Sequence, residues 1–118
     1  MSTTTITINA LSAINLTKLS ESGSGATQVN LAPGKYAVTL SENTMKFNSG
    51  STALIQQVIL FTTSPTIDKN YEKWFYTVNA SEGTVIKVEA DRPVYVFIVD
   101  HLLVSDNSGS AKVTFTPI

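Results

Sequence analysis

The 118-residue sequence contains no cysteine and a single histidine, His101. Without cysteine, neither a disulfide framework nor a thiolate metal site can form. His101 follows Asp100 at the end of an expected strand, and neighbouring strand residues point to opposite faces, so these two side chains are poorly placed to act as a base and its orienting carboxylate. The remaining carboxylates are scattered over expected turns. The sequence therefore predicts no catalytic residues and a protein that is not an enzyme.

Charge is sparse and balanced. Eight Lys and Arg residues stand against nine Asp and Glu residues, the formal net charge is -1, and there is no basic run. Nucleic-acid binding is therefore not expected. No apolar run is long enough to span a bilayer, and the first ten residues lack the basic and apolar regions of a signal peptide. We expect a cytoplasmic protein that does not associate with membranes, with secretion by a signal-less route as the alternative.

A helical periodicity is also lacking. Instead, Thr, Val and Ile recur in short runs bounded by Gly, Asn, Ser or Pro, which is typical of strands. The expected strands are residues 3–10, 27–31, 35–41, 53–63, 71–78, 85–90, 94–99 and 110–116, with residues 11–19 as an ambiguous ninth. The pattern predicts one all-β domain over residues 1–118, a jelly-roll-like β-sandwich of eight or nine mostly antiparallel strands.

The alternation within the strands also predicts which residues form the core. Ile86 and Val88 share one face of their strand, as do Val113 and Phe115 in the last strand. Segments 53–63 and 94–99 are apolar on both faces, which is typical of central, buried strands. The sequence Ala32-Pro33-Gly34 predicts a turn, and from that turn a hairpin between its flanking strands.

Aromatic residues gather between Tyr71 and Tyr76. For Phe75 and Tyr76 we expect core packing. Trp74 stands next to charged residues, as at a strand edge, where an exposed ring can stack on a sugar or contact a protein. Trp74 and Tyr71, together with His101 on the rim of the sandwich, are therefore the candidate ligand-binding residues.

Oxygen-bearing side chains are concentrated in residues 100–110, where Asp100 ends a strand and Asp106 and Asn107 precede a glycine turn. Calcium takes about six to eight oxygen ligands from carboxylates, amides and backbone carbonyls. The segment thus predicts a calcium site with Asp100, Asp106 and Asn107 as metal ligands. The alternative is that residues 106–109 form only a turn, in which Asp and Asn accept local amides.

The segment from Gly83 to Phe115 contains, in this order, an apolar strand that ends in Asp100, a loop with the sequence DNSGS and an alternating last strand. This segment resembles the calcium segment of the PA-I-type galactophilic lectin family and related small bacterial sandwich domains. Residues 32–40 are similar to that family's early Pro-Gly strand. The resemblance implies an oligomeric jelly roll in which calcium bridges the loop and sugar hydroxyls. It implies Asp100 and Asn107 as ligands, with Asp106 or a backbone carbonyl near Val104 and Ser105, and with the backbone of the loop of residues 42–49, near Phe47, closing the site.

One part of this loop differs from the family, because Leu102-Leu103-Val104 replaces small and hydroxyl residues. Exposed leucines at a loop tip are typical of a contact surface. Two functions therefore stay open. The first is a non-catalytic, lectin-like module that binds carbohydrate with the help of calcium. The second is a structural or interaction protein, a homo-oligomeric β-sandwich without a small-molecule ligand.

Overall fold

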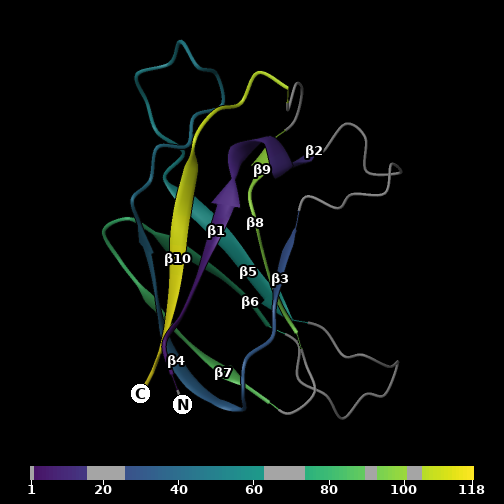
Figure 1. Cartoon of the computed structure of the whole chain (residues 1–118), viewed down its shortest axis with the longest axis vertical. Coiled ribbons are helices and arrows are strands. Elements are labelled where there is room, and N and C mark those ends of the chain that lie inside the picture. Colours follow the sequence, from purple (N-terminus) through teal and green to yellow (C-terminus); the bar gives the residue numbers. More distant parts are fainter. Residues whose placement is uncertain (1, 16–25, 63–73, 90–92, 101–104) are drawn as a thin grey trace.

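The computed structural model describes residues 2–15, 26–62, 74–89, 93–100 and 105–118. These ranges contain ten strands and one short 3-10 helix (Figure 1). In chain order they are β1 (Thr4–Asn9), η1 (Ala10–Ser12), β2 (Ile14–Asn15), β3 (Thr27–Val29), β4 (Gly34–Ser41), β5 (Gln57–Thr62), β6 (Trp74–Asn79), β7 (Thr84–Val88), β8 (Val94–Phe97), β9 (Val99–Asp100) and β10 (Ser110–Pro117). In the part of the chain that is described, no helix has the length and apolarity needed to cross a membrane.

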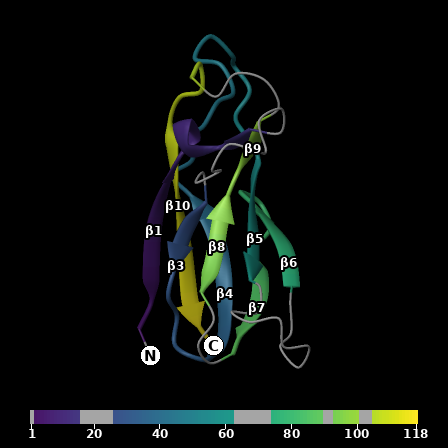
Figure 2. The ribbon, with the colours of Figure 1, turned by 90° about the vertical axis from the view of Figure 1, so that its right-hand side faces the viewer.

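Eight of the strands form two four-stranded antiparallel sheets. The first, here called the β10 sheet, has the order β1-β10-β4-β7, and the second, the β5 sheet, has the order β3-β8-β5-β6. The two-residue strands β2 and β9 form a separate parallel pair. Figure 1 shows the sheets as two layers, with β10 and β4 in one and β3 and β8 in the other, and Figure 2 shows β3, β8, β5 and β6 in this order across the β5 sheet. The predicted all-β sandwich is confirmed.

The strand pairing is nested, because β5 pairs with β6, β4 with β7, β3 with β8 and β1 with β10. A long antiparallel ribbon that rolls up on itself gives this order, which is that of a jelly roll. Consecutive strands of the two sheets consequently lie in opposite sheets, except β5 and β6. The hairpin predicted around Pro33 is therefore wrong: the chain reverses there, but β3 pairs with β8 and β4 with β10 and β7. Turn residues set a local reversal and do not choose the partner of a strand.

The core lies between the two sheets, on the inward faces of their strands. Ile86, Val88, Val113 and Phe115 are all at most 3% exposed, which confirms their predicted positions. The buried apolar residues of the β5 sheet that complete this layer are Val29, Val58, Leu60, Val78, Val94 and Val96.

Residues 42–56 close one end of this core. Met45 and Ile55 are buried there, and the Ile55 N–H donates to the Met45 carbonyl at 2.7 Å. The Asn43 side chain accepts from the Met45 N–H at 3.0 Å and donates to the Ile55 carbonyl at 2.6 Å. The strand that we predict over residues 53–63 therefore begins only at Gln57, because the preceding residues belong to this closing loop.

The central strands β5 and β8 are apolar on both faces, as their sequences show, but only one face of each is in the core. Ile59, Phe61 and Tyr95 point away from the β10 sheet and are partly exposed. Both strands are inner strands of their sheet, which confirms their predicted central place, but on the outward face only Phe97, at 8% exposed, is buried, because a two-layer sandwich has no third layer on this side. The outward face of the β5 sheet is thus an apolar surface.

Candidate functional site

The predicted metal ligands lie at the end of the sandwich away from the two chain termini (Figure 1). Asp100 is the last residue of β9, and Asp106 and Asn107 lie in the turn that precedes β10. We call this region the loop end. It consists of residues 10–15, 43–47, 98–100 and 105–110.

Residues 10–15 hold the turn before β10 in place. The Ala10 N–H donates to the Gly109 carbonyl at 3.0 Å, and the Ala10 carbonyl accepts from the Asn107 side-chain amide nitrogen Nδ2 at 2.9 Å. Ala10 itself is fully buried. The position and orientation of the Asn107 side chain are therefore fixed by the backbone of η1.

The same segment also binds the strand that carries Asp100. The Ile14 N–H donates to the Ile98 carbonyl at 2.9 Å, and Asn15 lies opposite Asp100 in the parallel β2–β9 pair. Asp100 and Asn107 are thus anchored to two ends of one six-residue segment, Ala10 to Asn15. Asp100 and Asn107, which residues 101–106 separate in the sequence, therefore lie in one region of the fold.

The loop of residues 43–47 fixes the turn from its other side. Lys46 and Ser108 form an isolated antiparallel bridge with N–H to carbonyl distances of 2.8 and 3.0 Å, and the Thr44 N–H donates to the Ser110 carbonyl at 2.8 Å. Gly109 has a φ of 86°, and a Cβ at this position would collide with the Thr44 carbonyl oxygen. Only glycine allows this close approach of the two backbones.

Asn107 is the most unusual residue of the loop end. It is 5% exposed, and its side-chain oxygen Oδ1 has no hydrogen-bond partner. Within the described ranges, it is the one buried side-chain nitrogen or oxygen in that state. A buried acceptor without a partner costs about 1–3 kcal/mol, so native structures normally pair such a group with a donor, a water molecule or an ion. An amide oxygen held in this way fits a hard cation such as calcium.

The carboxylates of the predicted site are less enclosed than Asn107. Asp100 is half-buried and Asp106 is exposed. Over the residues that the structure describes, no three His, Cys, Asp or Glu side chains converge. A calcium ion at the loop end would therefore use the Asn107 oxygen and backbone carbonyls in addition to Asp100 and Asp106. His101 and the apolar triplet of residues 102–104 lie outside the described residues.

An apolar pocket of about 390 Å³ adjoins the loop end. Its lining includes Phe47, Leu54, Ile59 and Val99, and Val99 directly precedes Asp100 in the chain. Phe47 and Leu54 are 46% and 37% exposed. Apolar walls next to a few oxygen atoms suit a ligand that has both an apolar face and hydroxyl groups.

The aromatic segment differs from its prediction. Trp74 is half-buried against the core, and its indole N–H donates to the Lys87 carbonyl at 3.0 Å, which links β6 to β7. Tyr71 lies outside the described residues. The exposed rings are instead Phe75 and Tyr76, which are 64% and 42% exposed, so their predicted place in the core is wrong. Strand β6 is at the edge of its sheet, so aromatic residues on both of its faces can remain exposed. The sequence pattern does not reveal which strands are edges.

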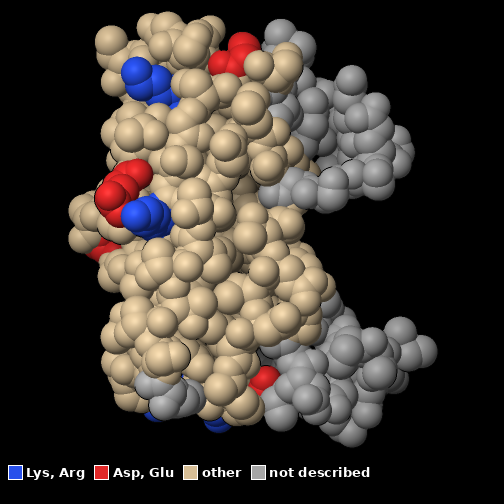
Figure 3. All heavy atoms as spheres, in the orientation of Figure 1, with Lys and Arg blue, Asp and Glu red and all other residues tan. Residues whose placement is uncertain are grey.

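Charged side chains are few and scattered on the face of the molecule seen in Figure 3. A scan against protein-family models finds no match, and searches of curated proteins and of solved structures find none either. The resemblance to the galactophilic lectins consequently stays a prediction from the sequence.

Proposed function

We propose that the protein is a non-catalytic, lectin-like module that binds carbohydrate with the help of calcium at the loop end. The observation that carries the proposal is the buried Asn107 Oδ1 without a hydrogen-bond partner. Calcium requires more oxygen ligands than Asp100, Asp106 and Asn107 supply, so its coordination shell has room for two neighbouring hydroxyl groups of a sugar.

Each part of the loop end has a role in this proposal. Asp100 supplies negative charge, and Asn107 supplies a neutral oxygen whose orientation is set by its bond to the Ala10 carbonyl. The bridge between Lys46 and Ser108 keeps the turn rigid before a ligand arrives, which lowers the entropy cost of binding. The neighbouring apolar pocket offers Phe47 to the C–H face of the sugar.

The test is a glycan array probed with the protein in millimolar calcium and again in EGTA. We expect a set of glycans that is bound in calcium and lost in EGTA, and loss of the same set in Asp100→Asn. The matched control is Glu42→Gln, because the Glu42 carboxylate pairs with Lys112 on the surface at 2.9 Å. Equal binding in both buffers would refute the role of calcium, and an array without any bound glycan would refute the lectin function.

A second function, homo-oligomer formation, is favoured by the outward face of the β5 sheet. Three ring pairs form a connected cluster there: Phe61 and Tyr95 stack at 4.9 Å, Phe61 and Phe97 meet edge to face at 5.4 Å, and Phe75 and Phe97 lie 6.5 Å apart. The four strands of this sheet contain no charged residue. Aromatic enrichment without charge is typical of the centre of protein interfaces.

The occupant that fits this face best is a second copy of the chain. The four strands have 3, 4, 6 and 6 residues and span roughly 300 Å² in projection, whereas a standard interface buries about 800 Å² of accessible surface on each partner. Exposed Phe47 and Leu54 extend the apolar surface beyond the end of β5. The face and these two residues would form the apolar centre of a dimer interface, with neighbouring polar residues as its rim. An uncharged surface also avoids like-charge repulsion when it meets its own copy.

A further inference from the structure

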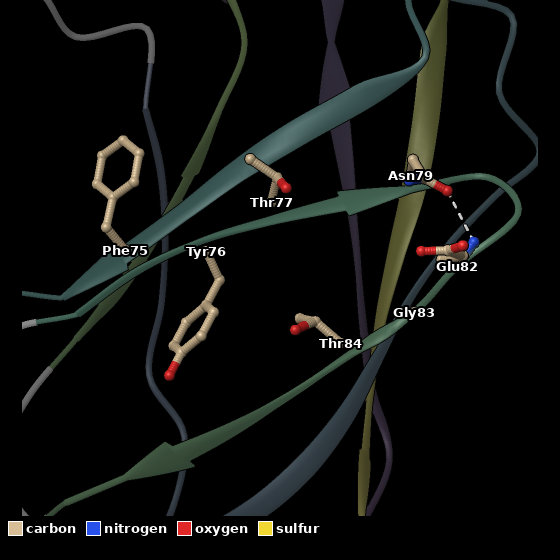
Figure 4. A pocket seen from close by; sticks show the side chains of 7 residues that line it. All are labelled: Phe75, Tyr76, Thr77, Asn79, Glu82, Gly83 and Thr84. Atoms are coloured by element: carbon tan, nitrogen blue, oxygen red, sulfur yellow. Dashed lines mark hydrogen bonds between the residues drawn. The ribbon is translucent and has the colours of Figure 1, made fainter.

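A groove of about 420 Å³ lies along β6, where the edges of the two sheets approach each other (Figure 4). Strand β6 is an edge of the β5 sheet and β7 is an edge of the β10 sheet, so the two strands share a connecting turn without forming a ladder. The lining residues come from β6, from this turn and from the start of β7. The groove is distinct from the loop end, with which it shares no residue.

One wall of the groove is aromatic. Figure 4 shows Phe75 and Tyr76 projecting from opposite sides of β6, with the Tyr76 ring over the gap toward β7 and Thr84 beside it. The Tyr76 ring lies 5.6 Å from the Trp74 ring, whose indole is fixed by its bond to Lys87. The Tyr76 ring therefore has the Trp74 ring beside it and is still 42% exposed, as a stacking platform requires.

The far end of the groove is polar and rigid. The Asn79 Oδ1 accepts from the Glu82 N–H at 2.7 Å, from the Ser81 N–H at 2.9 Å and from the Ser81 hydroxyl at 3.1 Å. A Cβ at Gly83 would lie 2.7 Å from the Val38 carbonyl oxygen, so the turn packs closely on β4. This network uses the side-chain oxygen of Asn79 as its common acceptor.

Donors and acceptors are consequently placed side by side. The Glu82 carboxylate only accepts hydrogen bonds, the Asn79 Nδ2 only donates them, and the Thr84 hydroxyl does both. Neighbouring hydroxyl groups of a sugar ring also donate and accept, so they match this set. The lining has one carboxylate and neither Lys nor Arg, which disfavours an anionic ligand.

The shape of the groove favours a compact ligand over an extended one. A peptide that added to β6 as a further strand would run along its whole length. The Trp74 side chain crosses from β6 to the Lys87 carbonyl and closes the gap at that end. The volume lies at the lower end of the range of about 300–1,000 Å³ for small-molecule pockets.

We propose that this groove is a second, calcium-independent binding site for a neutral hexopyranose, with Tyr76 as the stacking platform and Glu82 and Asn79 as hydrogen-bonding partners. The site does not rest on the calcium proposal, because none of its lining residues belongs to the loop end. A protein with both sites would bind two sugars and could cross-link glycans.

The test is a titration of ¹⁵N-labelled protein in EGTA with the methyl glycosides of β-galactose, β-glucose and α-mannose. We expect saturable shifts of the amides between Tyr76 and Thr84 with at least one of them. Tyr76→Ala should weaken this binding by about tenfold or more. The matched control is Ile118→Ala, which removes an exposed apolar side chain, 67% exposed, outside both the groove and the loop end.

A comparison of a charged with a neutral glycoside distinguishes a role of Glu82 in binding from a merely structural one. Methyl β-glucuronide should bind the groove of the natural protein at least about tenfold more weakly than the neutral glycoside, and Glu82→Gln should reduce this difference. No shift with any of the three glycosides, or shifts confined to the loop end, would overturn the proposal. So would a strand-forming peptide that alone shifts the β6 amides. Because the titration is done in EGTA and Asp100→Asn should leave it unchanged, its failure is distinct from failure of the calcium site.

Discussion

The outward face of the β10 sheet and the outward face of the β5 sheet differ in chemistry. On the β10 sheet the outward positions are mostly Thr, Ser and Lys; for example, the Thr5 and Thr114 hydroxyls lie 3.1 Å apart and Lys112 pairs with Glu42. On the β5 sheet they are mostly Ile, Phe and Tyr, and the rings pack on one another. Both sheets bury the same kind of inward residues. The two layers of the sandwich thus share one kind of core and differ in polarity on their outward faces.

The largest expected effect contrasts a Phe inside the sandwich with a Phe on the outward face of the β5 sheet. Phe115 is fully buried in the core, so Phe115→Ala should lower the free energy of unfolding by about 3–5 kcal/mol. Phe75 is 64% exposed, so Phe75→Ala should cost the isolated protomer less than about 1 kcal/mol. Urea denaturation at low protein concentration measures both. Equal losses would show that Phe75 is not on the surface of the protomer.

The next effect concerns the two outward faces directly. In Phe61→Lys a charge enters the aromatic cluster, and we expect the proposed dimer to separate into protomers of 12.7 kDa in sedimentation velocity. The control Thr39→Lys puts the same charge on the outward face of the β10 sheet and should leave the sedimenting mass unchanged. A natural protein that already sediments as a monomer at high concentration would contradict the interface.

A smaller effect is expected where the edges of the sheets meet. Trp74→Phe keeps a ring against the core but removes the 3.0 Å hydrogen bond to the Lys87 carbonyl, so the stability should fall by about 1 kcal/mol. Tyr76→Phe removes only an exposed hydroxyl and should change it by less than about 0.5 kcal/mol. Thermal unfolding of the two variants distinguishes them. Identical midpoints would mean that the indole bond does not tie β6 to β7.

Much of the fold follows from alternation in the sequence. Period-two patterns correctly place Ile86, Val88, Val113 and Phe115 in the core, because a strand with one buried face must alternate. The sequence does not predict in the same way which strands pair with each other. The turn at Pro33 looks like a hairpin turn, yet β3 and β4 lie in different sheets. Neither local turn chemistry nor strand composition predicts the nested strand pairing of a jelly roll.

The candidate sites were predictable only in part. Asp100, Asp106 and Asn107 stand out as oxygen-bearing residues near one glycine turn, but the burial of Asn107 depends on Ala10, almost one hundred positions away in the sequence. The exposure of Tyr76 depends on the edge position of β6. Long-range contacts decide both, and a single sequence shows no such contacts.

The unpaired oxygen of Asn107 is proposed to bind calcium. Metal that binds only the folded protein stabilises it by RT ln(1 + [L]/Kd), which is about 2.7 kcal/mol at 100 times Kd. The most direct test is thermal unfolding in millimolar calcium and in EGTA, with Asp100→Asn and the control Glu42→Gln alongside the natural protein. We predict that calcium raises the melting temperature of the natural protein and of Glu42→Gln by several degrees, and does not change that of Asp100→Asn. If a water molecule occupies the Asn107 oxygen instead, the melting temperature of the natural protein will be the same in both buffers. This result would refute the calcium site.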